Sequence, residues 1–415
     1  MNESPAFTQL TLSAGVRPTT RGEMAGLWVV GLAFAALMLA SLIEQYVPQK
    51  LSVLFFITFW PLMLLLHELG HAGMARLLGW RVGHLSLGFG PVLWRGQVAG
   101  TAVTLRAVPI EGYVVPAPNS ASGARWKSAL VYAAGPGAEL ALLGALIALF
   151  GADAVFSEST EPGALALKTL AIVIIWGAGF NLLPFAFKGG VSDGLGILLS
   201  PLMDDDGIEQ RLTTLEEMAA EELANAGRTD EAVALLDRLI GRNRKPDRLI
   251  DQSVAILAAA GEHDAARERL AGRLPETPIS EMDDVGLLHL DALTHLAAEK
   301  PDAFSLDLSL NRARRLAPDN RSLDVTRGIA DIRRGRTVEG ADRLAAAYRS
   351  LDAPMDGARA LGWLAVAAQR VGHEPAFVRF RNAFEHFNDH KPLRDQIHAQ
   401  IKAEQSTSGR SPDRP

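Results

Sequence analysis

The sequence contains no cysteine, although it is 415 residues long. This absence excludes disulfides, thiolate metal sites and a cysteine nucleophile, so a zinc ion could be held only by His, Asp or Glu. An excess of positive charge is missing as well, because the formal net charge is −6. Such a mild balance gives no argument for nucleic-acid binding, and we expect no nucleic acid among the partners.

Apolar residues, in contrast, are abundant: they make up 48% of the chain, and the mean hydropathy is +0.11. These values favour a membrane part joined to a soluble part, and the length allows two or three domains. Several runs in the first half have about the 20 residues that cross a bilayer as an α-helix. We expect membrane helices at about 25–43, 51–78, 129–150 and 164–187.

The stretch 79–127 differs from the apolar runs around it. It alternates apolar and polar residues, contains β-branched and aromatic side chains, and is punctuated by glycine. This pattern is typical of strands and predicts a β-hairpin or small sheet. The fold class that we expect for the membrane domain, residues 25–203, is therefore mainly α, with multi-pass membrane helices and a small membrane-associated β-hairpin or sheet.

The second apolar run contains His67, Glu68 and His71. Residues four apart share one face of a helix, so the two histidines can bind one metal ion, and Glu68 projects beside them as a proton acceptor. A chance H-E-x-x-H on a charged helix is usually a solvated surface. Here no charge occurs between Leu51 and Leu66, and ionisable residues at membrane depth are costly and usually functional. The pattern predicts a zinc site with a catalytic glutamate.

A catalytic zinc site usually has three protein ligands and one open position, so a third ligand is needed. His84 is the other histidine of the membrane half, but it lies in the expected strand segment, where we expect an ordinary polar residue. Asp193 follows a glycine-rich break after the fourth apolar run. Asp193 and Gly194 also form a common turn pair, and a simple turn is the alternative. The expected depth of this segment favours Asp193 as the third ligand.

The charges between the apolar runs are unevenly distributed. The N-terminal tail, 1–24, contains Arg17 and Arg21 before the first apolar run, and the segment 79–127 carries excess Arg and Lys, while the loop 151–163 contains acids and no base. By the positive-inside rule, the tail, the segment 79–127 and everything after about residue 188 face the cytoplasm. We therefore expect a multi-pass protein in the lipid bilayer of the cell membrane, a bacterial inner or plasma membrane, with both termini cytoplasmic.

From about residue 208 the chain is rich in Ala, Leu, Glu and Arg at helical spacing. A turn pattern of glycine, polar residues and alanine recurs near Gly227, Gly261, Gly335 and Gly372, and the first two are one tetratricopeptide period apart. We expect a tetratricopeptide-like α-helical domain, with a generic helical bundle as the alternative.

This domain is expected at 208–403, followed by a disordered tail at 404–415. Stacked helix pairs present extended concave surfaces, so we expect a cytoplasmic protein partner to bind through 208–403. The alternative is a solubilising or dimerising appendage.

The membrane half resembles the site-2 protease family of intramembrane zinc metalloproteases over roughly residues 50–200. The resemblance is carried by HELGH at 67–71, GFGPVLW at 88–94, PIEGYV at 109–114, AAGP at 133–136, and NLLP followed by SDG at 181–194. It implies Zn²⁺ as cofactor and the following roles: zinc ligands His67, His71 and Asp193, catalytic Glu68, and substrate-binding Asn181 and Pro184. The hairpin at 85–108 resembles the family's β element, which pairs with an unwound substrate by strand addition.

Three features depart from the family pattern. The gap from Pro184 to Asp193 is longer than usual, Glu139 stands where many members have asparagine, and no PDZ domain fits between the third and fourth helices. The missing PDZ domain leaves substrate selection to another part of the chain.

The resemblance implies an intramembrane zinc metalloendopeptidase that cleaves transmembrane segments of membrane-protein substrates, as in regulated intramembrane proteolysis. The alternative is a non-proteolytic membrane scaffold that recruits cytoplasmic partners through its helical repeats. Glu68 argues against it, because a structural metal site needs no general base. A transporter is a third possibility, which the small number of helices and the lack of an inverted repeat disfavour.

Overall fold

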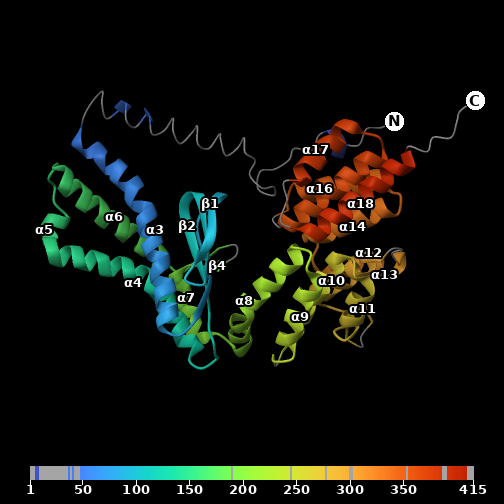
Figure 1. Cartoon of the computed structure of the whole chain (residues 1–415), viewed down its shortest axis with the longest axis horizontal. Helices are drawn as coiled ribbons and strands as arrows, with labels where there is room; N and C mark the ends of the chain where they lie inside the picture. The colour runs from blue at the N-terminus through green and yellow to red at the C-terminus, as the bar shows by residue number, and fades with distance from the viewer. Residues whose placement is uncertain are drawn as a thin grey trace, which may run out of the picture. The chain divides into compact units, whose positions relative to one another are not determined.

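The computed structural model describes residues 5–8, 36–37, 40–41, 47–187, 190–243, 245–275, 278–298, 302–351, 354–385 and 390–408 (Figure 1). The chain forms two compact units. We call Thr19–Leu215 the membrane unit, and Met1–Pro18 together with Glu216–Pro415 the helical unit. The expected fold class is confirmed: long apolar helices accompany a small antiparallel sheet, and many further helices follow.

The membrane unit is built around three long apolar helices (Figure 1). They are α3 (Leu51–Leu77, after the short η1, Pro48–Lys50), α4 (Ala124–Phe150) and α6 (Pro162–Leu182). Each is long and apolar enough to cross a membrane, and α3 packs against both others. The predicted helix at 25–43 lies almost wholly outside the described residues and stays a prediction.

Strands β1 (Arg81–Val98) and β2 (Thr101–Ala117) form the predicted hairpin. The turn residues Ala99 and Gly100 have φ angles of 48° and 77°, as a two-residue turn between twisted strands requires. The segment 84–87 of β1 pairs with two parts of β2, 102–105 and 112–115. Within the described part of the chain, 112–117 pairs only with β1, so its other edge carries unpaired backbone groups.

Short elements follow α6 and bring the chain back towards α4. They are β3 (Ala186–Phe187), β4 (Gly190–Val191), α7 (Asp193–Leu199) and η2 (Ser200–Leu202), and they lead into the longer α8 (Asp205–Asn225). The short α5 (Ala152–Val155) lies between α4 and α6. Helix α7 packs against α4. A Cβ atom at Gly194 would overlap the carbonyl oxygen of Leu182, so glycine allows α7 to begin directly against the end of α6.

The helical unit consists of helices packed in sequential pairs. They are α9 (Thr229–Ile240), α10 (Asp247–Ala260), α11 (His263–Ala271), α12 (Val285–Ala297), α13 (Ala303–Leu316), α14 (Arg321–Arg333), α15 (Thr337–Tyr348), α16 (Pro354–Arg370), α17 (Glu374–Glu385) and α18 (Lys391–Ser408), with α1 (Pro5–Thr8) added from the other end of the chain. Pairs such as α14 with α15 and α16 with α17 contact each other extensively. The tetratricopeptide assignment itself stays a prediction.

The four glycines of the repeated turn pattern all end helices in the same way. Gly227, Gly261, Gly335 and Gly372 have φ between 74° and 86°. The residue after each glycine donates a 2.9 Å backbone hydrogen bond five positions back: Arg228 to Leu223, Glu262 to Leu257, Arg336 to Asp331, and His373 to Ala368. This is the bond of a glycine helix cap, so the recurring sequence pattern corresponds to a recurring turn.

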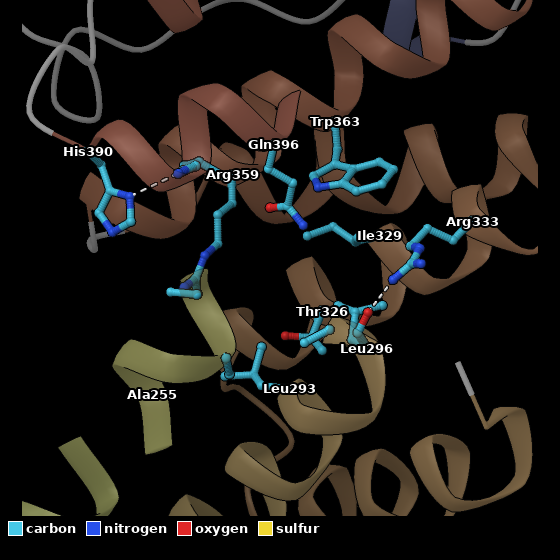
Figure 2. A pocket seen from close by; sticks show the side chains of 14 residues that line it. Ala255, Leu293, Leu296, Thr326, Ile329, Arg333, Arg359, Trp363, His390 and Gln396 are labelled. Atoms are coloured by element: carbon cyan, nitrogen blue, oxygen red, sulfur yellow. Dashed lines mark hydrogen bonds between the residues drawn. The ribbon is translucent and has the colours of Figure 1, made fainter. Parts of the chain in front are cut away.

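A small cavity of about 130 Å³ lies among the helices of the helical unit (Figure 2). Alanine and leucine side chains, Trp363, Arg333, Arg359 and His390 line it. Arg333 donates to backbone carbonyls, including that of Ala298 at 2.8 Å. Burial lowers the pKa of His390 to about 4, and nearby Arg359 adds to the effect. The cavity therefore contains a neutral imidazole at pH 7.

Acid should destabilise the helical unit through its partly buried histidines. Burial also lowers the pKa of His289 to about 4, and its Nε2 is 2.8 Å from Thr326 Oγ1. The unfolded side chain has a pKa of about 6.5, so below that pH the unfolded chain binds the proton first and stability falls. Between pH 6.5 and 5 the free energy of unfolding should drop by roughly 2 kcal/mol for this residue.

Urea unfolding of the full chain in detergent at both pH values measures this effect. His289→Gln should reduce the pH dependence, while His398→Gln on α18, whose side chain is far more exposed, should retain it. An equal pH dependence in His289→Gln and the unmodified chain would contradict the assignment.

Candidate metal centre

His67 and His71 lie one turn apart on α3, and both side chains are buried. Their relative exposures are 5% and 8%, and their Nε2 atoms are 3.1 Å apart. The four-residue spacing puts both rings on the same face of the helix, where they meet Gly135 of α4. The histidine pair thus has the geometry that the sequence predicted.

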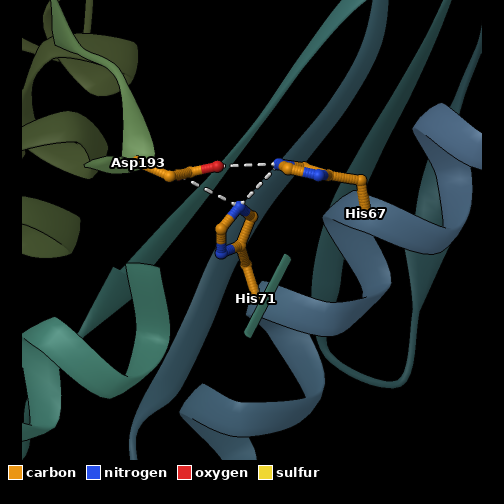
Figure 3. Close-up of side chains that lie close together, drawn as sticks. All are labelled: His67, His71 and Asp193. Atoms are coloured by element: carbon orange, nitrogen blue, oxygen red, sulfur yellow. Dashed lines mark hydrogen bonds and ion pairs between the residues drawn. The ribbon is translucent and has the colours of Figure 1, made fainter. Parts of the chain in front are cut away.

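Asp193 joins this pair from the start of α7 (Figure 3). Its Oδ2 lies 2.9 Å from Nε2 of His67, and its Oδ1 lies 3.3 Å from Nε2 of His71. Among the described residues, these three side chains form a group whose potential ligand atoms all lie within 4.8 Å of one another. His84 lies elsewhere, with its ring stacked on Tyr113 at 5.7 Å.

Ser192 fixes the backbone that carries Asp193. Its hydroxyl donates to the carbonyl of Leu183 at 2.6 Å and accepts from the N–H groups of Phe185 at 3.0 Å and Leu195 at 3.3 Å. It is the N-cap of α7. The segment is therefore both the turn and the third member of the group, and the two alternatives drawn from the sequence are compatible.

The Nδ1 atoms of the two histidines, which face away from the cluster, each lie within hydrogen-bond distance of another group. Nδ1 of His71 lies 2.7 Å from the carbonyl oxygen of Val131, and Nδ1 of His67 lies 3.1 Å from Oε2 of Glu139. A carbonyl can only accept, so His71 donates from Nδ1 and its Nε2 lone pair faces the cluster. Such partners commonly orient metal-binding histidines. Glu139 was noted in the sequence only as a departure from the family pattern.

The cluster leaves room for an ion on the side of α4. A Cβ atom at Gly135 would overlap His71 Nε2 and lie 2.8 Å from His67 Nε2. The absence of a side chain there leaves space beside the two imidazole nitrogens, which are also the atoms that lie closest to the Asp193 carboxylate. This donor set, with three protein ligands and a free direction, fits a zinc ion.

Glu68 lies beside the cluster, buried to 4% exposure. Strand β2 passes directly against it, because a Cβ atom at Gly112 would lie 2.8 Å from Glu68 Oε1. Only glycine lets the strand approach the carboxylate so closely. Glu68 thus lies close to residue 112 in the edge segment 112–117 of β2.

A cavity of about 930 Å³ connects these groups. The part of the hairpin that lines the cavity lies within residues 110–116. The resemblance had suggested the segment 85–108, which comes just before it. Asn181 lines the cavity, whereas Pro184 lies just beyond the end of α6 and is not among the lining residues. The structure therefore brings Asn181, but not Pro184, to the cavity that contains the cluster.

Removing the carboxylate of Glu139 should weaken metal binding. Glu139→Ala leaves Nδ1 of His67 without this acceptor, and loss of such a partner typically costs about 10–100-fold in metal affinity. Glu139→Gln keeps an accepting oxygen and should restore most of the affinity. Competition between the purified protein and a zinc chelator measures it, and equal affinities for all three proteins would show that the contact has no such effect.

Two histidines and an aspartate around one space, with a glutamate beside them at the edge of an apolar helix bundle, define a metal centre of the zinc metalloprotease class. The family model of peptidase family M50 matches residues 55–373, which is most of the chain. The chain therefore belongs to peptidase family M50, and its metal is zinc. The resemblance to site-2 proteases is confirmed at the level of the family.

Curated relatives match over short stretches. Proteins named as candidate zinc metalloproteases are 48% identical over 64 residues in Nostoc sp. and 48% identical over 52 residues in Synechocystis sp.. One in Ralstonia nicotianae is 45% identical over 67 residues. These stretches cover 15%, 12% and 15% of this chain, and only 18%, 14% and 14% of the respective relatives. No solved structure matches the chain significantly.

Proposed function

We propose that this chain is an intramembrane zinc endopeptidase that cleaves transmembrane segments of other membrane proteins, as in regulated intramembrane proteolysis. The observation that carries the proposal is the meeting of His67, His71 and Asp193 beside Glu68. These groups are buried in an apolar bundle and line a cavity large enough for a peptide segment. A merely structural metal site would not need the glutamate.

In this proposal His67, His71 and Asp193 hold Zn²⁺ and leave one position free. The bound ion supplies Lewis acidity, which polarises the scissile carbonyl and lowers the pKa of water. Glu68 takes a proton from the attacking water and delivers it to the leaving nitrogen. Its burial at the cavity keeps the carboxylate oriented towards the cluster.

The outer edge of β2 is the proposed place for the substrate backbone. A peptide bond in a helix is shielded by the helix's own hydrogen bonds, so the substrate must be extended before attack. The edge at 112–117 has unpaired backbone groups in the described structure, and it passes against Glu68. Strand addition there would present a carbonyl to the cluster. Asn181, which also lines the cavity, would bind the substrate backbone, and Pro184 lies just beyond the end of α6.

We also propose a location and a partner. The chain is a multi-pass protein of the cell membrane with both termini in the cytoplasm, as Arg17 and Arg21 in the tail and the excess Arg and Lys in 79–127 indicate. The helical unit binds a cytoplasmic protein that selects or admits substrates. Its stacked helix pairs supply the surface for such binding.

The test uses the full chain, reconstituted in lipid vesicles with a panel of single-span substrates. We expect one zinc ion per chain, cleavage inside the apolar segment as mapped by mass spectrometry, loss of both with a zinc chelator, and recovery on adding zinc. Cleavage that persists after complete zinc removal would contradict the proposal. Substrates trapped by an inactive variant and identified by mass spectrometry would supply the natural target.

A further inference from the structure

Ala6 and Phe7, near the start of the sequence, are buried in the helical unit against residues more than 300 positions away. Ala6 and Phe7 of α1 are 1% and 4% exposed and belong to the same hydrophobic core as α15, α16 and α17. The ring of Phe7 lies 5.6 Å from that of His373, in the turn before α17. An isolated four-residue helix is not stable in water, so α1 depends on this packing.

Charged side chains bind the backbone of the segment on both sides. The N–H of Ala6 donates to Oδ1 of Asp342 on α15 at 3.3 Å, and Arg379 on α17 donates to the carbonyl oxygen of Phe7 at 2.7 Å. The carboxylate of Asp342 can only accept and the guanidinium of Arg379 can only donate. The dipeptide Ala6-Phe7 therefore satisfies both groups in one chain direction, with the Phe7 ring inserted in the core. Apolar burial alone would not specify that direction.

We propose that α15 and α17 form a peptide-docking groove whose occupant is the chain's own N-terminal segment, residues 5–8. In this groove Asp342 and Arg379 bind the backbone of the short segment. The surface beside His373 binds its aromatic side chain. Docking ties residues 5–8, which precede the membrane helices, to the domain that follows those helices. A competing peptide with the same features has to displace this segment. The proposal stands apart from the proteolytic function.

Docking restricts the membrane topology. Two segments that pack in one hydrophobic core lie on the same side of a membrane, so the chain between them must cross it an even number of times. Three candidate spans lie among the described residues. One further crossing is therefore required, and the apolar run 25–43 is the sequence's candidate for it.

Photo-crosslinking tests the groove directly. Benzoylphenylalanine replaces Phe7 in the full chain, reconstituted in lipid vesicles. After irradiation we expect crosslinks within one polypeptide, mapped by mass spectrometry to 337–348 and 373–384. Crosslinks between two chains would assign the groove to a second copy, and crosslinks only to lipid or to the membrane unit would show that the segment does not dock there. Either result overturns the proposal.

Cysteine labelling supplies a second measurement, because the natural chain has no cysteine. Ala6→Cys should react with a maleimide far more slowly than Lys402→Cys, at an exposed position on α18. Adding Arg379→Gln removes a charged hydrogen bond and should speed labelling about tenfold. Arg381→Gln is the matched control, because Arg381 stacks over Phe377 instead, and should leave the rate unchanged. Equal rates for the two cysteines in the unmodified background would overturn docking.

An impermeant maleimide extends the test to topology. In sealed vesicles, Lys402→Cys and a cysteine in place of Ser13 should be labelled from the same side of the membrane. Labelling from opposite sides is incompatible with docking, whatever the activity of the protein. Because none of these measurements involves cleavage, failure of the groove and failure of the proteolytic proposal are distinguishable.

Discussion

Replacing Glu68 with glutamine should lower the rate of substrate cleavage by about 10²–10⁴-fold, the usual contribution of a general base, while leaving zinc in place. Glutamine has nearly the same shape, so it can keep the packing against Gly112. It cannot accept a proton at neutral pH. Glu68 is not one of the three side chains grouped around the proposed zinc position, and its substitution should therefore separate the chemistry from metal binding.

The measurement compares single-turnover cleavage of one membrane-anchored substrate by the two proteins, together with zinc content. Glu158→Gln is the control, because this exposed glutamate pairs with Lys168 at 3.1 Å and lies away from the cluster. It should cleave at the unmodified rate. Undiminished cleavage by Glu68→Gln would defeat the catalytic assignment, whereas loss of zinc from that variant would show that Glu68 acts as a ligand.

The parts of the centre that the sequence predicted are those set by local geometry. His67 and His71 must share a face of any helix that contains them, and the charge-free run before them gives that helix the length and composition to cross a membrane. Asp193 required a step of tertiary reasoning, because the depth of the last span had to be inferred from loop charges. The same Ser-Asp-Gly segment would read as a turn in isolation, and Ser192 does hold it as one.

The contacts that the sequence could not predict are those between distant segments. Glu139 and His67 are separated by 72 positions, and only the packing of α4 on α3 aligns them. The sequence feature that could have indicated this contact is Glu139 itself, a lone carboxylate within an apolar run. Such a carboxylate is costly unless it has a partner. The docking of Ala6 near Asp342 spans 336 positions, and no periodicity or motif in the first residues indicates it.

Replacing Gly135 with alanine should eliminate zinc binding and activity together. The added Cβ would overlap Nε2 of His71 and lie 2.8 Å from Nε2 of His67. The ring of His71 cannot easily retreat, because its Nδ1 is bound to the carbonyl of Val131 at 2.7 Å. Zinc binds imidazole nitrogen at about 2.0–2.1 Å, so a methyl group there competes for the same space. Alanine favours helix more than glycine does, and α4 itself should persist.

Gly137→Ala is the matched control on the same helix, because a Cβ atom at Gly137 has no neighbour within 4 Å. Zinc per chain, measured by elemental mass spectrometry after detergent purification, should be close to zero for Gly135→Ala and unchanged for Gly137→Ala. Circular dichroism of both variants checks that the helices remain. A folded Gly135→Ala protein with full zinc content would place the ion outside the space between the histidines and α4, and the ligand assignment would have to be abandoned.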